Sequence, residues 1–141
     1  MTAFAKYDQF VEDLASKVHN LVADTLKVAL TNRAPVPGTD ALLADISEIS
    51  SGNGYTSGGN AAAFVSGEET AGVFKLVLAD PATWTASGGT IGPFRYAVLY
   101  NSTASGGPLI GYHDYGSSIT LAVGETFQDD FDPSTGVLTI T

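Results

Sequence analysis

The chain has 141 residues, of which 44% are hydrophobic and 15% are charged, and its formal net charge is −9. This balance excludes an intrinsically disordered chain, because it supplies enough apolar surface for a core. We therefore predict a single domain over residues 1–141. The acidic surplus disfavours nucleic acid and anionic membrane surfaces as partners, because both are bound mainly through basic side chains.

The sequence contains no cysteine. Disulfide bridges, thiolate zinc sites and a cysteine nucleophile are therefore excluded, and the chain suits maturation in a reducing cytosol. No apolar run approaches the 18 residues that a membrane-spanning helix needs. Asp8, Glu12 and Asp13 stand where a signal peptide would be apolar, so we expect neither a membrane span nor a signal peptide.

Residues 4–22 have the three- and four-residue spacing of apolar side chains that is typical of an amphipathic helix. This stripe consists of Tyr7, Phe10, Val11, Leu14, Val18 and Leu21. It is expected to pack either on the protein's own core or on a partner subunit. In the second case the candidate interface residues are Tyr7, Phe10, Leu14 and Val18, and removing residues 1–22 would weaken assembly more than it unfolds the β domain.

Beyond residue 23 the periodicity changes to the alternation that is typical of strands. Residues 24–32 are predicted to form a strand, whereas residues 40–49 suit a short helix or irregular structure. Turn-forming sequences separate the other predicted strands, which lie near 61–66, 73–79, 94–101, 108–115, 118–123, 125–131 and 137–141.

The clearest of these strands lies within residues 93–101. Its alternation predicts that Phe94, Tyr96, Val98 and Tyr100 share one face of a sheet. Many short strands indicate a mainly β fold. We therefore predict an antiparallel β-sandwich or barrel of the jelly-roll or Ig-like kind, preceded by an N-terminal amphipathic helix at about 4–22.

The run GNGYTSGGN at residues 52–60 has the composition of a loop that binds phosphate. A phosphate loop needs a lysine after its last glycine, and a dinucleotide-binding loop needs a third glycine where Ser57 stands. Neither condition is met, so the glycines are predicted to serve backbone geometry. Tyr55 is expected to anchor the loop to the sheet. The loop faces either solvent or a neighbouring subunit, which makes Tyr55 the fifth candidate interface residue.

No catalytic or metal site is predicted, and no cofactor is expected. His19 is expected at the surface near the helix end, and His113 and Asp114 point to opposite faces of a strand. The acidic run at 129–136 departs from the spacing of a calcium loop and is predicted to be a β-turn. Core packing is the simpler role for the aromatic residues, but they would also suit a carbohydrate-binding module: Trp84, Tyr96, Tyr100, Tyr112 and Tyr115.

Several sequence blocks resemble small structural proteins that tailed bacteriophages encode. These blocks are GNGYTSGGN, FKLVLADPATWTASGGTIGPFRYAVLYN, PLIGYHDYGSSITLAVGETF and DPSTGVLTIT, and FVEDLASKVHNLVADTLKVALTN fits the same group. The resemblance implies a non-enzymatic role on the virion, with synthesis in the host bacterial cytoplasm. The small size, the acidity and the apolar helix favour a decoration, or cement, protein on the capsid exterior that binds the major capsid protein, and proteins of that type are commonly trimers. A tail or fibre component is the alternative.

Overall fold

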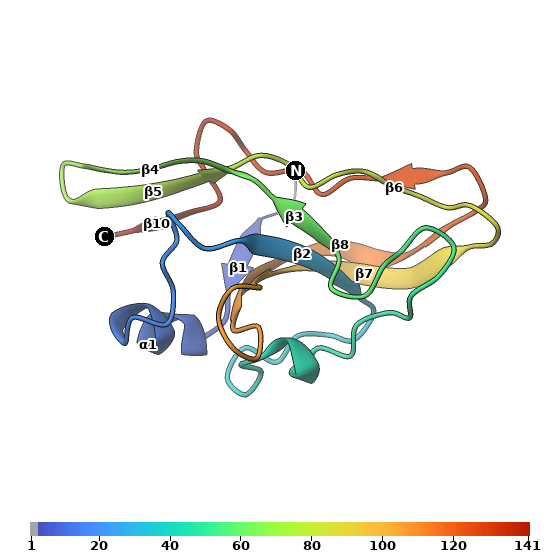
Figure 1. The fold of residues 1–141 in the computed structure, drawn as a ribbon, viewed down its shortest axis with the longest axis horizontal. Coiled ribbons are helices and arrows are strands. Elements are labelled where there is room, and N and C mark those ends of the chain that lie inside the picture. The colour runs from blue at the N-terminus through green and yellow to red at the C-terminus, as the bar shows by residue number, and fades with distance from the viewer. Residues whose placement is uncertain (1–2) are drawn as a thin grey trace.

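The computed structural model describes residues 3–141, and within them it shows a mainly β chain built from three antiparallel sheets (Figure 1). The largest sheet has the strand order β1-β8-β7-β2-β3. In that order its strands are Phe4–Lys6, Leu109–Leu121, Ile91–Asn101, Leu26–Thr31 and Asn60–Ala62. This arrangement confirms the predicted mainly β, antiparallel fold.

Two smaller sheets lie beside the five-stranded one. The first has the order β10-β5-β4 and consists of Leu138–Ile140, Val73–Leu78 and Phe64–Thr70. The second pairs β6 (Trp84–Thr85) with β9 (Thr126–Phe127). Residues 108–115 and 118–123 are predicted as two strands, but residues 109–121 form the single long strand β8. The segment 40–49 holds only a short 3₁₀ turn, Leu43–Asp45.

The five-stranded sheet is buried on both faces. On one face, Leu30, Leu99 and Ile110 pack against Leu76 and Leu78 of β5 in the main core cluster. On the other face, a second cluster forms beneath the connector that follows β2, and it consists of Tyr7, Ala29, Ile46, Tyr96, Val98, Tyr100 and Leu109. Burial on both faces explains why β2 and β7 are apolar along nearly their whole length.

The predicted face of β7 is correct for Tyr96, Val98 and Tyr100 but wrong for Phe94. Phe94 belongs to the main core cluster, on the opposite side of the sheet from the other three. The pairing of β7 with β8 shifts register between Phe94 and Tyr96. Such an irregularity moves every preceding side chain to the other face, which simple alternation does not reveal.

The predicted helix over residues 4–22 is largely wrong, because only Gln9–Ala15 forms the helix α1. Phe4–Lys6 is strand β1, which pairs with β8. The helix ends where Lys17 adopts a left-handed conformation with φ 66° and Val18 N donates to Asp13 O. Asn20 then folds residues 20–24 into a turn, because its side-chain oxygen accepts hydrogen bonds from Val22 N and Ala23 N.

Within residues 3–141 there is no helix with both the length and the apolar character needed to cross a membrane.

Candidate protein-binding site

The glycine run closes onto the sheet through Tyr55, as its sequence predicts. The Tyr55 side chain is buried, its hydroxyl donates to a Glu48 carboxylate oxygen, and it accepts a hydrogen bond of 3.0 Å from Leu30 N. The same Glu48 oxygen accepts a bond of 2.6 Å from Gly58 N. Burial, followed by the bond to Glu48, raises the pKa of Tyr55. Hydrogen bonds from Tyr55 and Gly58 to Glu48, and from Leu30 N to Tyr55, therefore hold the loop against the sheet.

Two glycines in this run permit close approach of backbones. Gly59 has φ +71°, and a Cβ there would lie 1.7 Å from the Val28 carbonyl oxygen. Gly54 has φ +106°, and its Cβ would lie 2.2 Å from the Thr85 carbonyl oxygen. No side chain fits at either position, which confirms that these glycines serve geometry.

His113 and Asp129 form a buried pair that the sequence did not predict. His113 Nδ1 lies 2.8 Å from Asp129 Oδ1, and the Tyr115 hydroxyl donates to the same carboxylate oxygen. The His113 ring also contacts Phe4 and Phe131. Because both members of the pair are buried, this arrangement ties the segment before β10 to β8 and offers no access to a substrate.

The other candidate chemical groups are also engaged in structure. Asp114 binds Arg95 at 2.8 Å, on the face of β8 opposite His113, as strand alternation predicts. In the described part of the chain, no three His, Asp or Glu side chains gather in a way that could hold a metal ion. Of the aromatic residues considered for a sugar platform, three are buried: Trp84, Tyr96 and Tyr100.

The five candidate interface residues do not lie on one surface. Tyr7, Phe10 and Tyr55 are buried inside the chain itself. Leu14 is half-buried against the main core cluster, and Val18 is 36% exposed. Phe10 and Leu14 line one surface cavity together, and Leu14 and Val18 line the larger cavity beside it.

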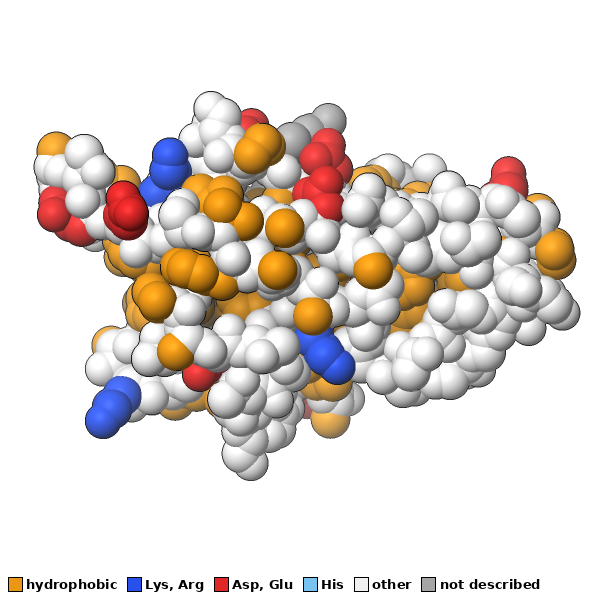
Figure 2. All heavy atoms as spheres, turned by 45° about the horizontal axis from the view of Figure 1, so that its top comes forward, with side chains coloured by type: hydrophobic (Ala, Val, Ile, Leu, Met, Phe, Trp, Pro, Cys, Tyr) orange, Lys and Arg blue, Asp and Glu red, His pale blue; other side chains and the backbone are white. Residues whose placement is uncertain are grey.

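That cavity is part of an apolar trough between α1 and the β10-β5-β4 sheet. Its larger section has a volume of about 420 Å³ and is lined by Leu14, Val18, Val22, Phe74 and Ile140, among others. A second section of about 250 Å³ shares Leu14 and Ile140 and continues along β10 to Lys6 and Val11. In the space-filling view, hydrophobic side chains gather in this region at the left of the molecule (Figure 2).

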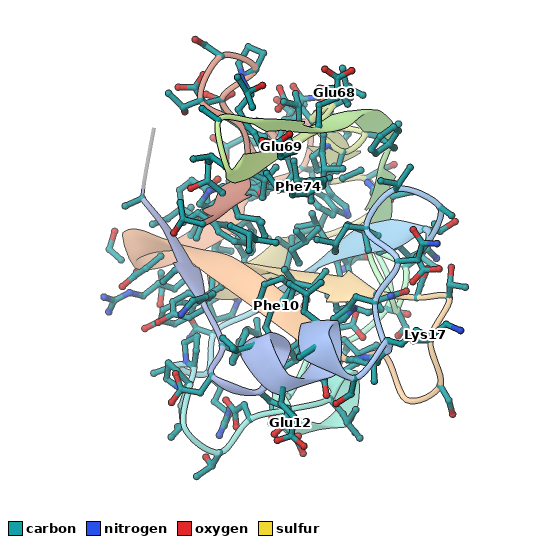
Figure 3. The ribbon with its side chains drawn as sticks, turned by 90° about the vertical axis from the view of Figure 1, so that its left-hand side faces the viewer. Phe10, Glu12, Lys17, Glu68, Glu69 and Phe74 are labelled. Carbon is teal, nitrogen blue, oxygen red and sulfur yellow. The ribbon has the colours of Figure 1, made fainter. Side chains whose placement is uncertain are left out.

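Two edges of the trough differ in charge and shape. The β4–β5 hairpin forms one edge and extends beyond α1 at the same end of the molecule (Figure 1). It carries Glu68 and Glu69, whereas Lys17 and Asp24 line the trough on the helical side. Figure 3 shows Phe10 and Phe74 directed into the space between the two edges, and Glu12 directed away from it.

His19 lies in the wall of this trough, although we expected it at the surface. It is 6% exposed, and its Nδ1 accepts a hydrogen bond of 3.1 Å from Asn101 Nδ2. The Asn101 oxygen is occupied by Thr103 N and Ala104 N, which fixes the orientation of that amide. In neutral His19 the proton is therefore on Nε2, and among residues 3–141 this atom has no hydrogen-bond partner.

Comparison with known proteins identifies no relative of this chain: no family model, no curated protein and no solved structure matches it.

Proposed function

We propose that this chain is a structural protein of a tailed-bacteriophage virion, and that it decorates the exterior of the assembled head as a cement protein. The observation that carries the proposal is the apolar trough, whose exposed lining includes Val11, Val18 and Val22. Exposed apolar patches of this kind occur at sites that bind other proteins. The resemblance of the sequence blocks to phage structural proteins is the reason for proposing a phage virion as the particle to which this site binds.

The open strands around the trough support the same role. β10 and β4 are the two outer strands of the three-stranded sheet, so each has one edge without a strand partner in that sheet. Such edges pair readily with a strand of another chain, and the major capsid protein is the partner that we propose. Many weak contacts of this kind on one lattice add up to firm attachment. As a finer description of the fold, we propose a β-sandwich of the jelly-roll or Ig-like kind.

Cryo-electron microscopy of particles that carry this chain tests the proposal. We expect density that fits residues 3–141 over the capsomers, with contacts to the major capsid protein. Density at the tail with none on the head would contradict a decoration role and would favour the tail component instead. Particles that lack the chain serve as the control, and we expect their heads to lose DNA at a lower temperature.

A further inference from the structure

We infer that the trough is a contact between two copies of this chain, in which the β4–β5 hairpin of each copy covers the trough of the other. This inference rests on the proposed function in one respect, that the trough binds protein. It goes further by naming a second copy as the occupant, so the open edges of β4 and β10, and not the trough, remain for the major capsid protein. A two-fold pair replaces the trimer that the phage resemblance implies.

The first argument is the placement of the complementary parts. The β4–β5 hairpin and α1 lie at the same end of the molecule (Figure 1), and residues of α1, β5 and β10 line the trough. A two-fold axis at this end brings each hairpin over the other copy's trough, so one symmetric contact covers both surfaces. The inner face of the hairpin is apolar, because Phe64 and Phe74 lie on the same side of β4 and β5 as Leu76 and Leu78.

The second argument is charge. Two of the six basic residues of this acidic chain, Lys6 and Lys17, line the trough. Asp24 lines it as well, but its carboxylate already accepts hydrogen bonds from Asn20 N and Asn101 Nδ2.

On the hairpin, Glu69 lies on the same face as Phe74, whereas Glu68 lies on the outer face and points away from the trough (Figure 3). Glu69 Oε2 accepts a hydrogen bond of 2.6 Å from Gly72 N in its own hairpin turn, so Oε1 is the oxygen left for a second partner. The two-fold contact brings this carboxylate to Lys17 of the other copy, and a charged pair at the rim of an apolar centre sets the register.

Sedimentation velocity of the purified chain gives the first test. We expect a monomer–dimer equilibrium with a dissociation constant of about 100 µM or tighter. Val22→Asp places a charge in the apolar contact and should weaken the dimer at least about tenfold. The matched control is Val123→Asp, because Val123 is 64% exposed in the turn between β8 and β9 at the other end of the molecule. A wild-type monomer at all concentrations, or equal weakening by both variants, would overturn the inference.

Charge reversal separates the Glu69–Lys17 pair from net charge. Glu69→Lys makes the chain less negative, and the reduced long-range repulsion between copies would by itself strengthen association. Loss of the local pair with Lys17 should instead weaken association about threefold. Lys17→Glu should weaken association as well, and the double variant should recover most of the wild-type affinity. Loss of the hydrogen bond between Glu69 and Gly72 N cannot produce that recovery, so the double variant separates the ion pair from damage to the hairpin turn. Glu68→Lys is the control, since its outward side chain makes no such pair. Equal effects of Glu68→Lys and Glu69→Lys would contradict the proposed register.

Disulfide trapping tests the contact directly, because the chain has no cysteine of its own. A mixture of Lys17→Cys chains and Glu69→Cys chains should form the mixed disulfide in preference to either homodimer on mild oxidation. If two identical variant chains cross-linked in preference to the mixed pair, the two copies would meet in a different arrangement. These tests use the purified chain alone, so a dimer that does not bind phage heads would contradict the proposed function and leave this inference standing.

Discussion

At the scale of single residues, the glycine run determines how the loop at 52–60 fits against β2. The backbone of Gly59 lies so close to the Val28 carbonyl that a Cβ would not fit between them. Gly58 donates its N–H to Glu48, and its carbonyl accepts a hydrogen bond of 2.6 Å from the Tyr100 hydroxyl. Burial and the nearby Glu48 carboxylate raise the pKa of Tyr100 to about 12, so this hydroxyl stays protonated as a donor. The loop is thus held by backbone contacts that tolerate no Cβ.

We predict that Gly59→Ala lowers the free energy of unfolding by more than about 3 kcal/mol. The new methyl group would meet the Val28 carbonyl oxygen at 1.7 Å, and β2 cannot retreat because it pairs on both sides. Gly124→Ala is the control: Gly124 has φ +89° but no atom within 4 Å of a built Cβ, so only backbone strain of about 1–2 kcal/mol remains. Urea denaturation measures both, and equal losses would contradict the steric explanation.

The environment of His19 predicts a loss of stability in mild acid. Burial lowers the pKa of His19 below its ordinary value of 6.5, although Asp13 and Asp24 oppose this shift. The unfolded chain therefore takes up a proton at a higher pH than the folded chain. The stability associated with neutral His19 is present in full above pH 6.5 and falls as the pH drops towards the pKa of the folded state.

Replacing the imidazole isolates this effect. We expect the free energy of unfolding of the wild type to fall as the pH drops below about 7, and His19→Gln to flatten that slope. Asn101 can still donate to the Gln side chain, so the variant keeps a neutral acceptor at this place. Denaturation curves at several pH values provide the measurement. If the wild type and the variant have the same slope, another group is responsible.

At the scale of elements, α1 shows how far apolar spacing can mislead. Tyr7, Phe10 and Leu21 are buried as the stripe requires, yet Tyr7 follows strand β1, Phe10 lies in a short helix and Leu21 lies in a turn. The clue that sequence reasoning missed is Asn20, whose side chain favours a turn over a helix interior. It also missed the pairing of β1 with β8, because Phe4 and His113 are far apart in sequence.

We predict that Phe10→Ala destabilises the monomer by about 3–5 kcal/mol, because Phe10 is 3% exposed in the main core cluster and packs on the His19 ring. Val11→Ala, one residue further on, is the control. Val11 is 55% exposed, so its truncation should cost less than about 0.5 kcal/mol. Thermal denaturation of dilute protein measures both. Similar losses would mean that α1 is not part of the core.

At the scale of the whole molecule, local alternation predicted most strands, whereas the trough could not be predicted. β2, β5 and β7 carry strong local patterns, so their positions are confirmed to within a few residues. The trough joins Leu14, Phe74 and Ile140, which come from three distant segments. Their proximity depends on how the β10-β5-β4 sheet lies over α1. That arrangement follows from long-range packing, which leaves no periodic signal in the sequence.

The shared core predicts that the chain unfolds as one unit. Leu76 of the three-stranded sheet, Trp84 of the two-stranded sheet and Leu99 of the five-stranded sheet belong to one cluster of buried side chains. Trp84 is the only tryptophan, so its fluorescence reports on the smallest sheet, whereas far-ultraviolet circular dichroism reports on all strands.

We therefore expect the two signals to give superimposable thermal transitions, because neither small sheet has enough buried surface to remain folded alone. Leu76→Ala should shift both transitions together, with a loss of about 2–5 kcal/mol, since Leu76 is fully buried. If only the circular dichroism transition moved, the β10-β5-β4 sheet would melt separately. The hairpin that we place against a second copy would then be an independent flap rather than a rigid edge of the domain.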